Sequence, residues 1–353
     1  MKARVPALDL LRLVAVLGVV LFHYGFRGPT GLEQTYVALP ELAAFARYGF
    51  LGVPVFFVIS GFVIAYSAEG RTAVEFAVAR FVRIYPTFVL CMTVTFLAVL
   101  LLGGSRFQAS LGQWTANLVI AAPGSRYVDS AYWSLVLEAV FYAWVALFIR
   151  LGLFQRRSDI LVAAWLGISL LNEMTLDATW ICKLLLADYS GFFATGILLY
   201  ELRKGRRDAA LQCLLAGSVM TAVYQSVHNL DWLRAETGAS FDDLIVGAIC
   251  LVSILIVMLA TRIRELPMSS SLVLGLGGLT YQLYLLHQQL GYVILLRIDD
   301  VTTTSVVLAV LGVGALSWAI WQFFEKPVQR AVKSVLTGIA HERHHAKRVP
   351  SSA

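Results

Sequence analysis

Charged residues are scarce in this chain. Asp, Glu, Lys and Arg make up 14% of its 353 residues, whereas a soluble domain has about 25%. Residues of hydrophobic type account for 59% of the chain. A soluble globular domain does not fit this balance, so the composition predicts an all-α, polytopic membrane protein.

Cysteine is also scarce, and its placement excludes two kinds of site. The four cysteines lie within or beside apolar segments, and they are Cys91, Cys182, Cys213 and Cys250. None of them forms a CxxC pair, so the sequence predicts neither a metal site nor a disulfide framework. We expect no bound cofactor either.

Long apolar segments are what the chain has in abundance. Ten of them are long enough, or nearly so, to cross about 30 Å of hydrocarbon, and they cover residues 7–25, 48–66, 81–102, 131–151, 160–175, 180–200, 208–226, 241–261, 272–296 and 303–325. The stretch 111–122 is shorter and is expected at the membrane interface or as a re-entrant loop. Residues 1–330 are predicted to form one transmembrane domain, and residues 331–353 a basic cytoplasmic tail.

The basic residues are distributed unevenly between the two sides of the membrane. With a cytoplasmic N-terminus, 20 of the 28 Lys and Arg residues fall on the cytoplasmic side, seven on the other, and Arg12 within the first segment. This excess predicts the orientation, with both termini in the cytoplasm. The net charge of +6 is then explained by loops that meet anionic lipid. We therefore expect a lipid bilayer, and no nucleic acid, as a partner.

The first apolar segment contains three ionisable side chains, Asp9, Arg12 and His23. A charge at the centre of a membrane helix costs about 2.5–3.5 kcal/mol on insertion scales, so such residues are candidates for function. Arg12 and His23 are eleven positions apart, which places them within about 20° of one helix face. His23 could serve as a general base. The alternatives are a hydrogen-bonded interfacial histidine and a local Asp9–Arg12 pair at i, i+3.

Arg80 and Arg83 form a second candidate site, near the start of the third segment. They are spaced i, i+3, so they share one face of a helix. The planar guanidinium group suits phosphate recognition. Contact with lipid headgroups at a positive-inside boundary is the competing interpretation, and charge alone favours it.

The fourth segment begins with Trp133 and Ser134 and contains Glu138. Ser134 and Glu138 are spaced i, i+4 and therefore share a face. A carboxylate one to two turns inside the membrane needs a partner or a proton, whereas Trp133 could belong to an aromatic belt. His287 lies among several polar residues of the ninth segment, where hydrogen bonding between helices is the favoured interpretation. Glu325, followed by Lys326 and Pro327, indicates a helix end stopped by proline.

The order of these motifs is more specific than any one of them. The matching stretches are LDLLR…FH at 8–23, GFLGVPVFFVISGFVI at 49–64, ARFVRIYP at 79–86, YWSLVLEAVFY at 132–142, SGFFATGILLY at 190–200, LTYQLYLLHQ at 279–288 and FFEKP at 323–327. Together they make the chain resemble the acyltransferase-3 family of integral membrane acyltransferases, over nearly its whole length.

The resemblance implies an O-acyltransferase that moves an acyl group, commonly acetyl, from cytoplasmic acyl-CoA to a hydroxyl of a carbohydrate at the membrane. It implies catalytic residues His23, Glu138 and Arg12, with His23 as base or acyl relay. It implies contacts to the CoA phosphates from Arg80 and Arg83, and acceptor or supporting residues Asp9, Trp133, Ser134, His287 and Glu325. Acyl-CoA would then be a co-substrate, and the cytoplasmic (inner) membrane the location.

Two further functions are compatible with the segments alone. Ten spans with polar residues near the midplane and segments interrupted by Gly or Pro also fit a carrier or export component. Against a carrier, spans one to five and six to ten match neither in motif nor in loop length. A structural partner in a polysaccharide assembly complex is the other alternative.

Overall fold

The computed structural model describes residues 5–30, 39–120, 126–263 and 265–332. The secondary structure of these residues is entirely helical. The helices of eight or more residues are α1 (Pro6–Phe22), α4 (Gly52–Ala68), α5 (Ala73–Leu102), α7 (Trp133–Arg150), α8 (Ser158–Leu171), α10 (Ser190–Arg203), α11 (Ala209–His228), α12 (Leu230–Thr237), α13 (Asp243–Ala260), α14 (Ser270–Leu295) and α15 (Thr303–Ile320).

Shorter helical pieces join or extend these helices. Three of them are π-helical turns, η1 (His23–Arg27), η4 (Asn172–Leu176) and η6 (Trp321–Glu325). The others are α2 (Gly28–Thr30), α3 (Pro40–Ala46), η2 (Gly49–Leu51), α6 (Leu111–Asn117), η3 (Ser130–Tyr132), α9 (Thr179–Leu185) and η5 (Ala187–Tyr189). The prediction of an all-α fold is confirmed. Of the predicted basic tail, residues 333–353 lie outside the described part of the chain.

The helices are long and apolar enough for a multi-pass membrane protein. In the described part of the chain, eight helical stretches are long and apolar enough to span a membrane. A ninth is formed by α9 with η5 and α10, which meet at a bend of 55°. The 26-residue α14 is also long enough to cross, and its mean hydropathy is lowered by the buried polar residues Gln282, His287, Gln288 and Gln289. These elements account for the ten predicted segments.

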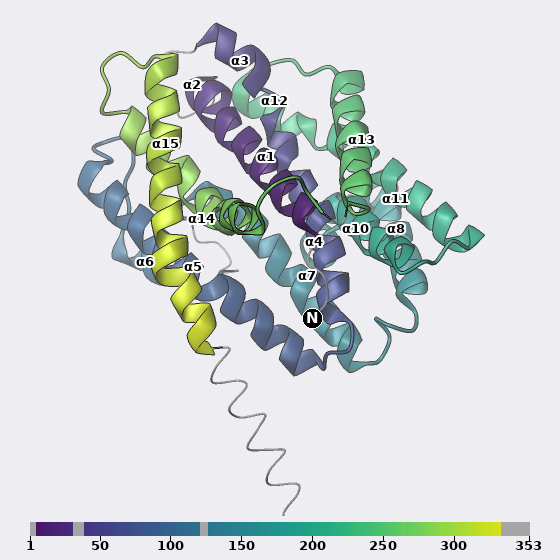
Figure 1. Ribbon diagram of the computed structural model, residues 1–353. Coiled ribbons are helices and arrows are strands. Elements are labelled where there is room, and N and C mark those ends of the chain that lie inside the picture. Colours follow the sequence, from purple (N-terminus) through teal and green to yellow (C-terminus); the bar gives the residue numbers. More distant parts are fainter. Residues whose placement is uncertain (1–4, 31–38, 121–125, 264, 333–353) are drawn as a thin grey trace, which may run out of the picture.

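Helix α1 lies at the centre of the molecule, between α4 and α14 (Figure 1). On the α4 side, α10, α11 and α13 pack in succession. On the α14 side, α14 contacts both α15 and α5. Two large apolar clusters follow this division, one built around α4 and α10 and the other around α14 and α5. The first apolar segment of the sequence is therefore the element on which both halves pack.

Helices α4 and α10 are in very close contact. A Cβ at Gly61 would lie 2.2 Å from the backbone oxygen of Phe193, and a Cβ at Gly196 would lie 2.1 Å from the backbone oxygen of Val58. Small residues let two membrane helices approach in this way. Beside the glycines, the rings of Phe57 and Phe193 stack at 4.7 Å between centroids. This half of the molecule is therefore tightly packed behind the candidate site.

The periphery of the molecule is apolar, as a lipid-facing surface must be. Helices α13 and α15 lie on opposite sides of the view in Figure 1. Each exposes a row of large hydrophobic side chains, which are Leu244, Ile245, Leu251, Val252, Leu255, Ile256 and Leu259 on α13, and Val307, Leu308, Leu311 and Trp318 on α15. In water such rows would be unfavourable; in a bilayer they are the expected surface.

Two helix boundaries differ from the predicted ones. Helix α5 begins at Ala73, not at residue 81, because Thr72 and Glu75 form a capping box. Pro327 was predicted to end the last span, but the helix continues to residue 332. The π-helical turn η6 ends two residues before Pro327, and its wider turn accommodates a residue that lacks an N–H and crowds the preceding turn.

The start of α11 shows how a connecting loop is fixed. Asp208 caps this helix by accepting from the backbone N–H of Leu211 at 3.0 Å. Arg206 donates to the same carboxylate at 2.9 Å. The Arg206 hydrogen bond, together with the helix N–H, lowers the pKa of Asp208 to about 2.

Candidate active site

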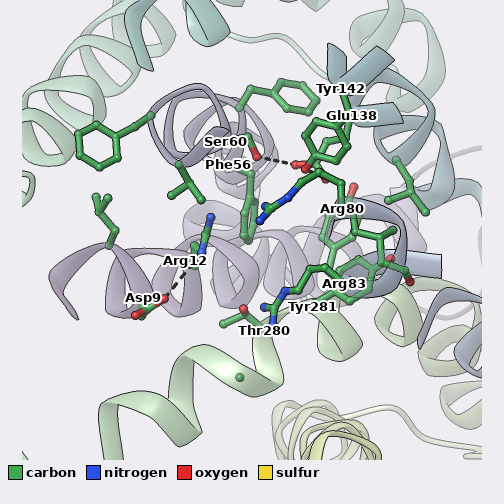
Figure 2. Close-up of a pocket in the computed structure, with 18 of the residues that line it drawn as sticks. Asp9, Arg12, Phe56, Ser60, Arg80, Arg83, Glu138, Tyr142, Thr280 and Tyr281 are labelled. Carbon is green, nitrogen blue, oxygen red and sulfur yellow. Dashed lines mark hydrogen bonds and ion pairs between the residues drawn. The ribbon is translucent and has the colours of Figure 1, made fainter. Parts of the chain in front are cut away.

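A large cavity of about 680 Å³ opens between α1, α4, α5, α7 and α14. We call it the arginine cavity. Its charged lining residues are Asp9, Arg12, Arg80, Arg83, Glu138, Lys326 and Arg330. Figure 2 shows Arg12 from α1 and Arg80 and Arg83 from α5 pointing into the same space. Cations outnumber anions in this lining, so the cavity attracts an anionic ligand.

Arg12 is held by its neighbour on α1. Its guanidinium lies 3.7 Å from the carboxylate of Asp9, which confirms the predicted i, i+3 pair. The side chain of Arg12 is 23% exposed and that of Asp9 7%. The carboxylate offsets part of the cost of placing the guanidinium inside the bundle, while Arg12 still faces the cavity.

Arg83 forms an ion pair with Glu325, a residue far from it in sequence. It donates to Glu325 at 2.9 Å, and Glu325 also accepts from Gln282 and Gln329. Glu325 is only 2% exposed, and η6 places it against α5 and α14. The Glu325 of the closing motif is therefore the carboxylate that neutralises Arg83.

Arg80 is arranged differently from Arg83. Its Nε is buried and has no hydrogen-bond partner among the described residues. No described ion pair includes this arginine either. A buried donor without a partner is destabilising, and a ligand with acceptor oxygens would satisfy it.

Glu138 lies on the wall of the arginine cavity opposite α1. Its Oε1 accepts from the Ser60 hydroxyl at 2.5 Å, and its Oε2 accepts from the Tyr142 hydroxyl at 3.1 Å (Figure 2). One turn earlier on α7, the Ser134 hydroxyl lies 2.6 Å from that of Tyr284. Ser134 and Glu138 thus face the same cavity, as their spacing predicted.

A second cavity, of about 400 Å³, contains His23. We call it the histidine cavity. Its lining includes aliphatic residues such as Val19, Leu51 and Leu233, together with aromatic and uncharged polar residues, among them Phe50, Ser130, Trp133, Tyr189, Gln225, Asn229, Trp232 and Gln288. The one cation of this lining, Arg27, pairs with Glu236 at an Nε–O distance of 3.0 Å and lies over the Trp232 ring. A charge-balanced, aromatic pocket suits a neutral, polar ligand.

His23 sits where α1 changes into the π-helical turn η1. Turns of this kind are rare and are often found at functional sites. Nδ1 of His23 lies 2.9 Å from the hydroxyl of Tyr292 on α14. Because His23 lines the cavity and Nδ1 is engaged, Nε2 is the nitrogen available to a ligand. A neutral imidazole held in this way can accept a proton.

The structure separates two groups of residues that the sequence suggested would meet. Arg12 and His23 were expected to line one polar stripe, yet they open into different cavities. Glu138 was expected beside Trp133 on the acceptor side, but Trp133 lines the histidine cavity and Glu138 the arginine cavity. Arg12 and His23 share a face but are separated by about 16 Å along the helix axis, and Trp133 and Glu138, five positions apart, diverge by about 140° around α7. Val53 lines both cavities, so the two adjoin there.

His287 lies between the cavities and lines neither of them. Several other lining residues were not predicted from the sequence. Lys326 and Arg330 add charge to the arginine cavity, and Arg27, Tyr189 and Trp232 shape the histidine cavity. Only Lys326 had a signal, since it follows Glu325 in the closing motif. Within the described residues no group of three or more His, Cys, Asp or Glu could hold a metal ion.

The two cavities together can position an anionic group on one side and a neutral, polar one on the other. His23, in the histidine cavity, has one nitrogen available for proton transfer. This is the arrangement that a transfer reaction between two substrates requires.

The chain is similar in sequence to known acyltransferases. The family model described as an acyltransferase domain, of the acyltransferase-3 type, matches residues 5–322. O-acetyltransferase OatA of Staphylococcus aureus is 24% identical over 240 residues, which is 62% of this chain and 34% of OatA. Acyltransferase MdmB of Streptomyces mycarofaciens is 31% identical over 161 residues, which is 42% of this chain and 40% of MdmB.

The chain thus aligns with about a third of OatA and two fifths of MdmB. The comparison with solved structures returned no match. The family match covers nearly all of the helical bundle that surrounds the two cavities. The chain belongs to the acyltransferase-3 family of membrane proteins, and its helices are those of a multi-pass protein.

Proposed function

We propose that this protein transfers an acyl group, most simply acetyl, from acyl-CoA to a hydroxyl of a carbohydrate. The donor binds in the arginine cavity and the acceptor in the histidine cavity. The acetyl group is suggested by the name of the O-acetyltransferase relative. The observation that carries the proposal is the buried, unpartnered Nε of Arg80 in a cation-rich cavity.

The arginine cavity has the charge and the size for a CoA ester. Guanidinium groups bind phosphates in bidentate geometry, and Arg80 has donor capacity that no described residue uses. Lys326 and Arg330 extend the cationic surface toward the end of the helix after η6. A volume of about 680 Å³ lies within the range of pockets that bury most of an organic ligand.

The histidine cavity has the lining expected for a sugar. The apolar C–H face of a sugar ring packs against aromatic side chains, and Trp133, Tyr189 and Trp232 supply them. Sugar hydroxyls need both donors and acceptors, which the amides of Asn229 and Gln288 provide. Because Arg27 is already paired with Glu236, the cavity favours a neutral acceptor.

In the proposed reaction, Nε2 of His23 removes the proton from the acceptor hydroxyl. The hydroxyl oxygen forms a bond to the thioester carbonyl carbon, and the C–S bond breaks. The CoA thiolate leaves and takes up the proton from His23. The acyl group reaches His23 past Val53, where the two cavities adjoin. Glu138 and Arg12 line the donor side and orient the ester.

We place the protein in the cytoplasmic membrane with both termini in the cytoplasm. The excess of Lys and Arg in alternate loops supports this orientation. It also places the arginine cavity, which contains the helix ends around Arg80 and Arg330, on the side where acyl-CoA is found.

The test is acyl transfer by purified protein in nanodiscs, with acetyl-CoA and a panel of neutral sugars and no ion gradient. Arg80→Ala should raise the KM for acetyl-CoA about tenfold or more, because it removes a charge-assisted phosphate contact. Arg71→Ala is the matched control, since Arg71 is an exposed arginine outside the cavity lining. An unchanged KM in Arg80→Ala would reject the donor site.

The same assay separates the proposal from a carrier. A carrier would move the sugar or its conjugate across proteoliposomes and leave acetyl-CoA intact. Free CoA and an acetylated sugar, identified by mass, would support the transferase. If purified protein transports a sugar but forms neither free CoA nor an acetylated sugar with any member of the panel, the carrier replaces the transferase.

A further inference from the structure

A third cavity, of about 200 Å³, lies between α7 and α8 and takes no part in the proposed reaction. We call it the α7–α8 groove. Its lining is almost entirely apolar and includes Phe141, Trp144 and Phe148 of α7 and Ala164, Trp165 and Ile168 of α8. None of its lining residues lines the arginine cavity or the histidine cavity. The groove is therefore a separate feature of the fold.

The groove exists because α7 and α8, although consecutive in the chain, pack on different neighbours. Helix α7 packs on α4 and α5, whereas α8 packs chiefly on α10 and α11. The rim of the resulting gap faces outward, since Ala164 and Ile168 are both exposed. No water is available at this depth of a bilayer, and an apolar cavity does not retain water. Hydrocarbon is the medium that can fill the groove.

The polar groups at one end of the groove are already paired. The chain bends by 55° between α9 and α10, at Leu186, and such a bend leaves carbonyl groups without helical partners. The indole N–H of Trp144 donates to the carbonyl of Leu184 at 2.7 Å, and that of Trp165 donates to the carbonyl of Leu185. Both indole donors are thus used, and their rings present apolar surface to the groove.

The length of the groove matches one leaflet of a bilayer. Along α8 its lining runs from Ser158, the first residue of the helix, to Ile168. Ten residues of α-helix rise about 15 Å, which is half of the hydrocarbon thickness of about 30 Å. The groove therefore extends from the membrane surface at the α7–α8 loop to the middle of the bilayer.

The membrane-surface end of the groove is cationic. Arg150, Arg156 and Arg157 are all exposed there, and no ion pair between described residues includes them. The backbone N–H groups of Arg156 and Arg157 donate to the carbonyl of Leu153 at 3.2 and 2.8 Å. This turn keeps both arginines next to Phe154, which lines the groove. Guanidinium groups bind phosphate oxygens, so an anionic headgroup suits this end.

We propose that the α7–α8 groove binds one acyl chain of an anionic phospholipid, with the lipid phosphate against the arginines of residues 150–157. This site is independent of acyl transfer. It takes its lipid from the leaflet that the α7–α8 loop faces. A polyprenyl-linked sugar in the histidine cavity would place its phosphates near Trp133, which is at the opposite end of α7 from Arg150. The charge therefore favours a phospholipid over an isoprenoid carrier.

Photolabelling tests where the acyl chain lies. The protein is placed, one copy per nanodisc, in equal parts of phosphatidylcholine and phosphatidylglycerol, with a trace of phosphatidylglycerol that carries a diazirine in its acyl chain. Peptide mass spectrometry should find the label concentrated on α7 and α8. Ala164→Trp fills the groove and should lower this labelling severalfold. Gly167→Trp is the matched control, because Gly167 is exposed on the same helix and has open space beside it.

Equal labelling of the two tryptophan variants would overturn the proposal, as would label spread evenly over α13 and α15, because either result would show only general contact with the bilayer. Displacement of the label by polyprenyl phosphate would assign the groove to an isoprenoid chain and would also overturn it. Native mass spectrometry of the wild-type protein needs no variant. One phosphatidylglycerol should remain bound after transfer to detergent, and retention of none would reject the site.

A second pair of variants tests the headgroup. Arg156→Gln combined with Arg157→Gln should lower the preference for labelled phosphatidylglycerol over labelled phosphatidylcholine, by about fivefold for each arginine removed. Arg262→Gln is the control, since Arg262 is an exposed arginine that follows α13. An unchanged preference in the double variant would overturn the assignment of an anionic headgroup.

Discussion

The arginine cavity and the histidine cavity lie side by side in one helical bundle, yet their linings differ in kind. The arginine cavity is larger, at about 680 Å³ against about 400 Å³, and carries five Lys or Arg residues. The histidine cavity is aromatic, and its one cation is paired. A single binding site would not need two linings of opposite character.

The difference teaches how one membrane protein can handle two unlike substrates. An anionic donor is bound mainly by charge, which acts over several ångströms. A neutral acceptor is bound by shape and by placed hydrogen bonds. Keeping the charges out of the histidine cavity also leaves His23 without an adjacent carboxylate among the residues that line it. Each cavity can then be altered without altering the other.

The largest effect should come from the histidine cavity. His23→Ala removes the base and should lower kcat more than about a hundredfold, with little change in acetyl-CoA binding, because His23 does not line the arginine cavity. His228→Ala is the control, since His228 stacks on Tyr224 at the surface of α11. A wild-type rate in the His23 variant would show that His23 is not the base, and the histidine cavity would then no longer be the catalytic one of the two.

The arginine cavity should respond in stability as well as in binding. Arg83→Ala leaves Glu325, which is 2% exposed, without its cation, and should cost about 3 kcal/mol of unfolding free energy. Glu325→Gln leaves Arg83, which is 40% exposed, facing the cavity, and should cost about 1 kcal/mol. Thermal unfolding of the purified variants measures both.

The order of the two losses is what matters. If Glu325→Gln were the more damaging change, Glu325 would be a structural anchor for Gln282 and Gln329 more than a counter-ion. Glu325→Gln should also lower the KM for acetyl-CoA, because it frees the charge of Arg83.

Much of this arrangement could be predicted from the sequence. Intramembrane charges are costly, so Asp9, Arg12 and Glu138 were recognisable from hydropathy alone. Helical spacing then placed Arg80 with Arg83 on one shared face and Ser134 with Glu138 on another. Both pairs line the arginine cavity. These predictions succeeded because they depend on contacts within one helix.

The division into two cavities could not be predicted, because it depends on contacts between helices. His287 and Tyr292 are brought to His23 by the packing of α1 on α14. The π-helical turns η1 and η6 also left no recognisable pattern, and η6 allows the helix to run past Pro327. Sequence patterns are interpreted with 3.6 residues per helical turn, and π-helical turns depart from that spacing.

A smaller effect should follow from trimming the wall of the histidine cavity. Trp232→Ala removes one aromatic face and should raise the KM for the acceptor about threefold to tenfold, with the KM for acetyl-CoA unchanged. Trp180→Ala is a close control, because Trp180 is 65% exposed and Trp232 64%, and Trp180 lines neither cavity. Equal effects of the two substitutions would mean that Trp232 acts on the fold and not on the acceptor.

The smallest effect should be the response to salt, and it should fall on one substrate alone. Raising ionic strength from about 50 mM to about 500 mM shortens the screening length and weakens exposed charges more than buried ones. Arg12 and Arg83 are 23% and 40% exposed, so the KM for acetyl-CoA should rise only about twofold to threefold. The KM for a neutral acceptor should not change, because the cation of the histidine cavity is already paired. A parallel rise in both constants would mean that charge is shared between the cavities, and that the wall around Val53 does not separate them electrostatically.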